Sequence, residues 1–418
     1  MSKFFTFFDT FIGSGYAVTM WNHPDRPYQD LPALPPSGVV ETPAVLKATI
    51  TASRALARLD GAYKRLPDPT MLINLIPLME AQASSEIENI VTTNDELFKA
   101  ANGALPDVTP QVKEALRYRE ALRAGHESLA TRPITTKTAV EVCSHIHART
   151  AIIRNQPGTY IGNPTTGNRI YTPPEGRGVI LDHLSAWERF LHSDHGLDPL
   201  VVMALSHYQF EAIHPFFDGN GRTGRVLNLL ILIETGLLQL PILYLSGHIM
   251  RHKDTYYEQL NAVTREDAWE PWILFMLDGV ESTARWTLDL VETTDTMRAA
   301  METEIRALNS KVPAASLTRL LFSQPYLRID NVVEAGLAKR QTAARWLTEI
   351  SDTGLVVKEK VGRNVVFINT RLLQTLFQTP LPDWCPPPPP GGPPRVPRLG
   401  PEGGTPPRPI VTSNTARH

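Results

Sequence analysis

The feature that most constrains this chain is a glycine-rich stretch of twelve residues between two apolar segments. It reads His214-Pro-Phe-Phe-Asp-Gly-Asn-Gly-Arg-Thr-Gly-Arg225. The segment before it, residues 199–213, places Val201, Leu205, Tyr208 and Ala212 on one helical face, and the segment after it, residues 226–233, is apolar except for Asn228. A helix that is apolar on every side is expected to be buried. The sequence therefore predicts a helix, a glycine loop and a buried helix.

The polar residues of this stretch suit a bound phosphate. Glycines let backbone N–H groups turn inward, and the N-terminus of the following helix adds a positive dipole end. Arg222 and Arg225 supply forked donors that match phosphate oxygens. Asp218 is the only acid in the stretch, so a phosphate-bridging Mg²⁺ would depend on it. His214 is the one group there that takes a proton near neutral pH. These residue types indicate a nucleotide phosphate site with a base beside it.

The stretch also resembles the signature of the Fic family, H-x-F-x-[DE]-G-N-G-R-x-x-R, and matches each of its specified positions. The alternative is a glycine-rich surface loop with incidental charge. The resemblance implies that His214 is the general base, that Asp218 holds Mg²⁺ and that Phe216 anchors the loop. It further implies nucleotide contacts by the following residues: Gly219, Asn220 and Gly221 in an anion hole, Arg222 at the β-phosphate, Arg225 at the γ-phosphate, and Thr223 and Gly224 between them.

The activity implied by the resemblance is transfer of AMP from ATP, with Mg²⁺, to a Ser, Thr or Tyr hydroxyl of a target protein. Self-modification and a homodimer are further expectations. Two alternatives remain open. The same site could transfer another nucleotidyl or phospho group, or could remove AMP. A function of another class is a DNA-binding regulator with a nucleotide-sensing pocket, although sensing alone needs no base such as His214.

An upstream helix, expected at about residues 69–90, carries a second pattern. Pro77 either kinks this helix or marks its start. Near its end, Ser84 and Glu88 are four residues apart and share a face. With Asn89 they resemble the inhibitory motif of Fic proteins, [ST]-x-x-x-E-[GN]. We expect Glu88 to pair with Arg225 and so remove a phosphate ligand. The alternative is an ordinary solvated helix end.

Residues 155–176 are rich in glycine and proline and predict a β-hairpin. Fic proteins have a hairpin flap here that holds the target segment by strand addition. The family usually has G-x-Y-R at its start, whereas this chain has Gly158-Thr-Tyr-Ile161, so the arginine is missing. Further along, the resemblance places Tyr256 near the adenine, whereas we expect Tyr257 to pack in the core.

Length and composition are those of a globular protein with two to three domains. The chain has 418 residues, 42% hydrophobic and 20% charged, and a net charge of −2, which gives no overall basic field for nucleic acid. Two cysteines form no disulfide framework, which fits the cytoplasm, and Cys143 should be buried. No signal peptide is recognised at the N-terminus, and the apolar run 226–240 is too short and too polar to cross a membrane.

We expect a mainly α fold: a Fic-type helical core with a hairpin flap, followed by a C-terminal winged helix-turn-helix. Residues 314–321, 329–335 and 339–350 predict its three helices, and residues 353–368 predict two strands. The winged helix either binds DNA or packs against protein. The expected organisation is an N-terminal extension at 1–28, a helical region at 29–105, the core at 106–300, the winged helix at 310–375 and a disordered proline-rich tail at 380–418.

Overall fold

A computed structural model describes residues 21–66, 69–105, 107–162, 168–309, 311–361, 364–378 and 381. The described residues belong to one compact unit and are mainly helical, which confirms the predicted fold class. Most of the expected N-terminal extension and proline-rich tail lie outside the described residues. The expected boundaries at residues 105 and 300 stay predictions. In the described part of the chain, no helix combines the length and apolarity needed to cross a membrane.

The helices before the glycine-rich stretch are α1 Pro43–Arg65, α2 Thr70–Ile87, α3 Asn94–Ala101, α4 Pro110–Ser128, α5 Thr136–His147, α6 Arg177–His192 and α7 Pro199–Ile213. Those after it are α8 Asn220–Glu234, α9 Leu245–Arg251, α10 Lys253–Glu266, α11 Trp269–Leu308, α12 Ala314–Ser323, α13 Ile329–Glu334, α14 Arg340–Asp352 and α15 Thr370–Gln378. The strands are β1 Ile161–Gly162, β2 Arg169–Tyr171, β3 Tyr326–Arg328, β4 Val357–Val361 and β5 Asn364–Ile368.

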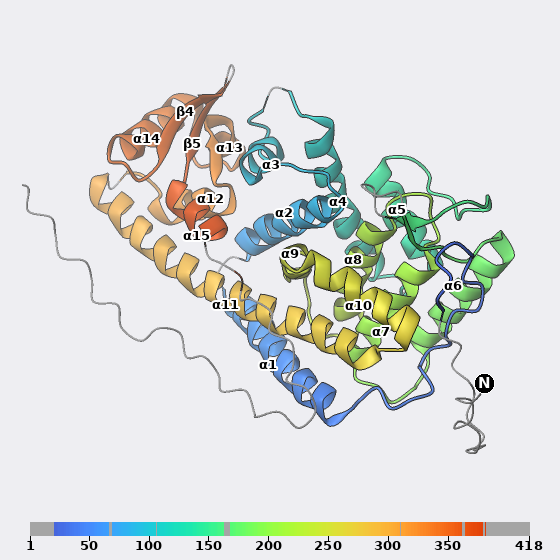
Figure 1. Cartoon of the computed structure of the whole chain (residues 1–418). Helices are drawn as coiled ribbons and strands as arrows, with labels where there is room; N and C mark the ends of the chain where they lie inside the picture. Colours follow the sequence, from blue (N-terminus) through green and yellow to red (C-terminus); the bar gives the residue numbers. More distant parts are fainter. Residues whose placement is uncertain are drawn as a thin grey trace, which may run out of the picture. The chain divides into compact units, whose positions relative to one another are not determined.

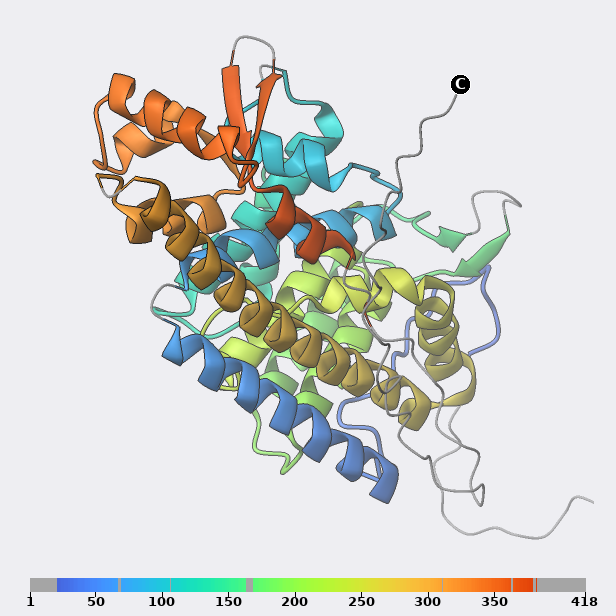
Figure 2. The same cartoon turned by 90° about the vertical axis from the view of Figure 1, so that its left-hand side faces the viewer.

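The first helix begins at Thr42-Pro43, a pair whose residue types suit an N-cap followed by proline at the first helical position. Thr42 is its N-cap and accepts a hydrogen bond from the Val45 N–H at 3.3 Å, while Pro43 occupies the first helical position, where no donor is lost. One face of α1 carries exposed basic side chains and the other packs along α11. Figures 1 and 2 show the two helices side by side from two directions. This pair closes one side of the helical core.

The helices α7 and α8 run through the centre of the core. Nearly every residue of α7 is buried, including the polar His207 and Gln209, so the predicted single apolar face was too narrow. The second helix, α8, is buried as predicted. It begins at Asn220 instead of near Val226, so half of the expected loop is helix. The two arginines of the glycine-rich stretch therefore project from the first turns of a buried helix.

Helix α2 lies between the core and the C-terminal part of the chain (Figure 1). It starts at Thr70, so Pro77 lies inside it and does not mark its start. It ends at Ile87, earlier than predicted, with Glu88 as its C-cap. Almost all of α2 is buried, because α4, α9 and α12 pack around it.

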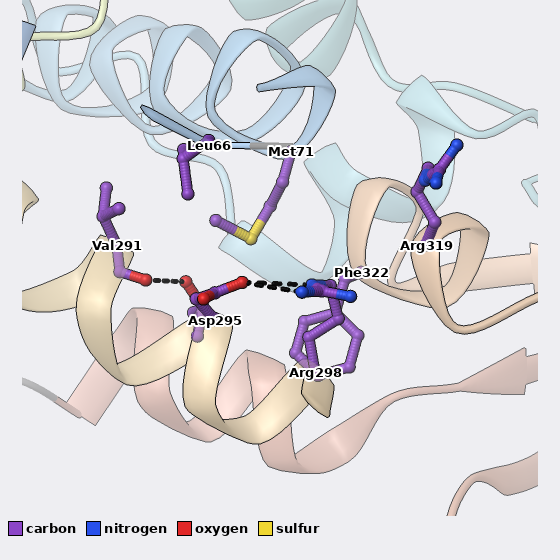
Figure 3. Close-up of a pocket in the computed structure, with 8 residues that line it drawn as sticks. Leu66, Met71, Val291, Asp295, Arg298, Arg319 and Phe322 are labelled. Atoms are coloured by element: carbon purple, nitrogen blue, oxygen red, sulfur yellow. Dashed lines mark hydrogen bonds and ion pairs between the residues drawn. The ribbon is translucent and has the colours of Figure 1, made fainter. Parts of the chain in front are cut away.

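Helix α11 is one continuous helix of 40 residues. Its first half packs on α1, α7 and α9, and its later part contacts α12 and α15. A cavity of about 30 Å³ remains where α1, α2, α11 and α12 meet. Figure 3 shows Leu66 and Met71 above it, with Asp295 and Arg298 paired below at 2.9 Å. The cavity is about the size of one water molecule.

The C-terminal part contains the three predicted helices, α12, α13 and α14, and the two predicted strands, β4 and β5. Both strands pair antiparallel, and a short strand that the sequence did not predict, β3, completes a sheet in the order β3-β5-β4. Helix α15 was also not predicted. The winged helix-turn-helix assignment stays a prediction. Tyr326 donates a hydrogen bond to Asp95 of α3 at 2.6 Å, which ties this sheet to the N-terminal helices.

The predicted hairpin is present as β1 paired antiparallel with β2. Its tip, residues 163–167, lies outside the described residues. The chain before it leaves the helical state at Ala148, and residues 149–160 form no helix.

Candidate active site

The glycine-rich loop proper spans residues 214–219 and is closed by Asn220. The Phe216 N–H donates to Asn220 Oδ1, and Asn220 Nδ2 donates to the Phe216 carbonyl, both at 2.8 Å. Gly219 has a φ of 84°, a left-handed conformation in which a side chain would be strained. Phe216 is buried, as its predicted anchoring role requires. The Asn220 amide thus uses its oxygen and one of its two N–H donors within the loop, and its role as an anion-hole donor stays a prediction.

A buried arginine that sequence reasoning missed holds the start of the loop. Arg154 donates from Nε to the His214 carbonyl at 2.7 Å and from Nη2 to the Ile213 carbonyl at 3.1 Å. Its backbone N–H donates to the Pro215 carbonyl at 3.0 Å. These bonds satisfy carbonyls that the end of α7 leaves without helical partners. The sequence offered one signal: Arg154 directly follows the three apolar residues 151–153.

His214 lies at the end of α7 with a φ of 49° and is half-buried. Its Nδ1 has no hydrogen-bond partner within the described part of the chain. Burial and the nearby Arg154 guanidinium lower the pKa of His214 to about 4. The imidazole is therefore neutral at pH 7 and able to accept a proton.

Arg225 is enclosed by the end of α2. Its Nε donates to Ser84 Oγ at 2.8 Å, and its Nη2 donates to the Ser84 carbonyl at 3.0 Å and to Glu88 Oε1 at 2.7 Å. Ser84 is fully buried and Arg225 is 2% exposed, so the alternative of a solvated helix end is wrong. A Cβ at Gly221 would overlap Glu88 Oε1, so a side chain at this position would displace the Glu88 carboxylate. The structure thus brings the predicted pair together.

Asn89, the third residue of the predicted inhibitory motif, follows the end of α2 in a left-handed conformation, with a φ of 61°. Asparagine tolerates this conformation better than most residues. Its Oδ1 accepts a hydrogen bond from Lys253 Nζ of α10 at 3.1 Å. Asn89 therefore turns the chain and ties the end of α2 to α10.

Arg222 has a different environment from Arg225. It is 1% exposed and forms an ion pair through Nη1 with Glu114 of α4, a residue that the sequence analysis did not single out. Its Nη2 points to the Asp218 side, 3.6 Å from Asp218 Oδ1. One end of the guanidinium is therefore held by α4 and the other lies beside the loop.

Asp218 has the chemistry of a magnesium ligand. Its carboxylate is 64% exposed and lies 3.8 Å from His147 Nε2. Among the residues that the structure describes, no cluster of three or more His, Cys, Asp and Glu side chains could hold a metal ion. Mg²⁺ in phosphate-transfer sites usually binds one or two carboxylates together with substrate phosphates and water. A single exposed carboxylate beside two arginines fits that kind of site.

A pocket of about 500 Å³ opens between the hairpin, α7 and α10, and its lining includes Ala212, two residues before His214. Tyr257 lines it and is 40% exposed, so the expectation that Tyr257 packs in the core is wrong. Tyr256 is 1% exposed, and its hydroxyl lies 2.8 Å from His207 Nε2 in the interior. The structure therefore does not place Tyr256 in the pocket, and its predicted position at an adenine would have to be taken by Tyr257.

Two further residues predicted to contact the nucleotide lie in the interior of α8. Thr223 is fully buried, and Gly224 faces His207 and Glu211. Glu211 lines the pocket, and burial raises its pKa to about 8, with Arg225 opposing the shift. Its Oε1 has no hydrogen-bond partner among the described residues. Glu211 is a second residue of this region that the sequence analysis missed.

Comparisons with known proteins agree with this site and fold. Residues 46–127 match the profile of the Fic/DOC family N-terminal domain, and residues 297–372 match the C-terminal domain of SoFic-like protein adenylyltransferases. This chain belongs to the Fic family. The two matched regions flank the glycine-rich loop on both sides in sequence.

Two curated relatives share the most informative similarity with this Fic protein. Protein adenylyltransferase Fic of Drosophila yakuba is 33% identical over 121 residues, which is 28% of this chain and 23% of the relative. The protein of the same name from Culex quinquefasciatus is 34% identical over 112 residues, 26% of this chain and 21% of the relative. The chain thus matches less than a quarter of the length of each.

A solved structure supports the fold. The crystal structure of a Fic family protein from Desulfovibrio desulfuricans G20 aligns with 81% of this chain and 98% of its own, with a TM-score of 0.51 and 18% identity. At this identity the likeness establishes the fold alone. The Fic fold of this chain therefore has independent support from sequence profiles and from structure.

Proposed function

We propose that this Fic protein transfers AMP from ATP to a hydroxyl side chain of a protein, and that Glu88 keeps the activity low. The observation that carries the proposal is the convergence on one loop of a neutral histidine, two buried arginines and an exposed carboxylate. A nucleotide-sized pocket opens beside them. The names of the curated relatives support the same reaction.

The pocket supplies a site for the base of the nucleotide. Tyr257 offers an exposed ring for stacking, and Leu260 adds apolar surface. The polar side chain of Asn261 lines the same pocket and has both donors and an acceptor for a base edge. The hairpin lines the pocket from the opposite side through Ile161 and Ile170, where strand addition of a target segment would bring its hydroxyl near the loop.

The phosphates would lie between the loop and the start of α8. Arg222 and Arg225 are the donors for the two leaving phosphates, and the backbone N–H groups at the start of α8 are directed to the same region. Asp218 would hold Mg²⁺, which when bound neutralises charge on the phosphate oxygens. The contribution of the protein is then mainly positioning and electrostatics, as is usual for transfer at phosphorus.

His214 serves as the base. The hydroxyl oxygen of the target forms a bond to the α-phosphorus, while the bond between that phosphorus and the bridging oxygen to the β-phosphate breaks. The hydroxyl proton passes to the neutral imidazole of His214, and pyrophosphate leaves with the bonding electron pair. The lowered pKa of His214 keeps the imidazole unprotonated at neutral pH, so no prior deprotonation is needed.

Glu88 opposes this reaction through Arg225. The Nε and Nη2 donors of Arg225 are both used by Ser84 and Glu88. A γ-phosphate needs the same donors, so it must either displace Glu88 or bind elsewhere. ATP that binds without Arg225 would have its α-phosphorus out of line with the attacking hydroxyl. The protein is then expected to label slowly until Glu88 moves.

The test is a labelling reaction with the Glu88→Gly variant, Mg²⁺ and ATP that carries the label in either the α- or the γ-phosphate. AMP transfer predicts protein labelling from the α-label alone, and the mass of a modified peptide identifies an adenylyl group. Labelling from the γ-label would show phosphoryl transfer instead. Loss of a preformed AMP group, without labelling under any condition, would favour the reverse reaction.

A further inference from the structure

The ion pair between Glu114 and Arg222 is not explained by inhibition. Arg222 is 1% exposed, and Glu114 reaches it from α4, a helix that also packs against α2, α5 and α8. Only the Nη1 end of the guanidinium is engaged by Glu114. The Nη2 end faces Asp218, and Nε has no partner in the described part of the chain.

The two arginines therefore present their donors in opposite ways. On Arg225, Ser84 and Glu88 use the edge formed by Nε and Nη2. This is the edge that makes two parallel bonds to an anion. On Arg222, Glu114 takes the far end and leaves donors on the side of Asp218. The contact at Arg225 blocks an anion, whereas the contact at Arg222 leaves room for one.

We infer that Glu114 is a positioning residue, which holds Arg222 so that its Nη2 is directed to the phosphates of the bound nucleotide. The inference rests on the proposed function and adds a residue to it. Arginine has a long side chain with several rotatable bonds, and holding one end in advance removes part of the ordering cost when the ligand binds. Glu114 is suited to this because α4 is itself fixed by three neighbouring helices.

Without Glu114, the nearest carboxylate to Arg222 is that of Asp218, 3.6 Å away. A freed Arg222 would pair with it. The pair would use the donor meant for phosphate and, at the same time, the oxygens meant for Mg²⁺. Loss of Glu114 should therefore weaken the binding of the metal–nucleotide complex, even though it removes a negative charge from a site for anions.

Whether replacing Glu114 weakens or strengthens nucleotide binding decides between a positioning role and a second inhibitory contact. If Glu114 blocked Arg222 as Glu88 blocks Arg225, its removal would strengthen nucleotide binding and speed labelling. If Glu114 positions Arg222, truncation weakens binding. Replacement by glutamine, which keeps an acceptor oxygen at the same reach, preserves binding or improves it because the negative charge is gone.

The experiment uses the Glu88→Gly protein as the parent and compares Glu114→Ala, Glu114→Gln and the control Glu120→Ala. Glu120 is on the same helix but pairs with the exposed Arg123. Binding of Mn²⁺ with a non-hydrolysable ATP analogue is followed by electron paramagnetic resonance, and KM and kcat are measured by labelling. We expect Glu114→Ala to raise the Kd about tenfold, the scale on which misplaced ligand groups act. Glu114→Gln and Glu120→Ala should bind at least as tightly as the parent.

Tighter or unchanged binding by Glu114→Ala overturns the inference, and so does a tenfold loss in Glu114→Gln. If Glu114→Ala does not fold, as judged by thermal melting, Glu114→Asp takes its place, because aspartate keeps the charge but is one methylene too short to hold Nη1: weaker binding than that of the parent supports positioning, and equal or tighter binding contradicts it. If the parent binds the analogue but labels nothing, the proposed transferase activity fails, while the binding measurements still test Glu114.

Discussion

The two sides of the glycine-rich loop differ in how far they are closed. On the α2 side, Arg225 is enclosed and donates three hydrogen bonds to Ser84 and Glu88. On the opposite side, Asp218 is 64% exposed and Arg222 keeps donors directed to it. Both arginines are buried and both face a glutamate, so neither residue type nor burial explains why one side is closed and the other open. The two sides differ in which guanidinium donors the glutamate occupies.

Under the proposed function, this contrast would separate ligand binding from regulation within the site. The Asp218 side would receive a metal and phosphates without rearrangement, whereas the α2 side would have to open first. Because residues 75–85 of α2 are buried, we expect that opening to involve the C-terminal end of the helix, where Glu88 is partly exposed and Asn89 is exposed. The following predictions test each side and the residue between them.

The largest effect is expected at His214, which lies between the two sides. His214→Ala in the Glu88→Gly background should lower AMP labelling by about 10²–10⁴-fold, because the hydroxyl then has no base to take its proton. Binding of an ATP analogue should be retained, since the donors for phosphate lie on Arg222 and Arg225. Calorimetry measures binding of the ATP analogue, and the labelling assay measures transfer. Labelling near that of the parent would show that another group accepts the proton.

Glu88→Gly opens the α2 side alone. A charge-assisted, partly buried pair contributes on the order of 1.5–3 kcal/mol, so its loss should raise labelling about 10- to 100-fold. Glu86→Gly is the matched control, because this carboxylate accepts from Gln82 and forms no ion pair with an arginine among the residues that the structure describes. Arg225→Ala should not imitate Glu88→Gly, since it also removes a phosphate ligand. Equal labelling by Glu88→Gly and wild type at saturating ATP and Mg²⁺ would mean that the α2 side is not a barrier.

Much of this contrast could be predicted from the sequence, but not all of it. The spacing of Ser84 and Glu88 predicted a contact with Arg225, because the family motif supplies both partners. Glu114 has no comparable signal: it is one of many charged residues on an amphipathic helix, and only the packing of α4 on α8 brings it to Arg222. Arg154 was missed for the same reason. Its partners are backbone carbonyls at the end of α7, which no side-chain pattern reveals.

The fold shows the same limit. Caps and apolar patterns placed α1 and α7 well, because local residues determine where they begin. The start of α8 was placed too late, since the glycines suggested a loop where close packing requires them inside a helix. The adjacent tyrosines 256 and 257 could not be assigned from their order alone. Which of them faces the pocket depends on how α10 is rotated against the core.

A smaller effect is predicted for Tyr257, which lines the pocket. Tyr257→Ala should raise the KM for ATP about tenfold, because stacking of a base on an aromatic ring contributes about 1–3 kcal/mol. kcat should change little, since Tyr257 is remote from the transferred group. Tyr256→Phe is the control: it removes the hydroxyl that contacts His207 in the interior and should leave KM unchanged. If Tyr256→Phe raises KM and Tyr257→Ala does not, the assignment of the two tyrosines is reversed.

The smallest effect concerns Glu211 and asks whether the α2 side holds a second carboxylate for Arg225. Burial raises the pKa of Glu211 to about 8, so its carboxyl group is protonated at neutral pH and does not compete with Glu88. A pKa that is higher in the folded than in the unfolded state means that the folded protein binds the extra proton. The stability from this group is present below the unfolded pKa and is lost as pH rises through about 8.

Glu211→Gln removes this titration. Relative to wild type, the variant should gain stability as pH rises, by on the order of 1 kcal/mol per pH unit between pH 7 and 8. Glu80 is the other buried carboxyl group near Arg225, and its pKa is raised to about 7. Between pH 7 and 8 Glu80 is therefore mostly ionised, and its effect on the pH dependence of stability is small. Thermal melting from pH 6 to 8.5 measures the difference. A difference that does not change with pH would mean that Glu211 is already ionised and paired with Arg225. Removing Glu88 would then leave Arg225 with a second carboxylate, and Glu88→Gly would open the α2 side only in part.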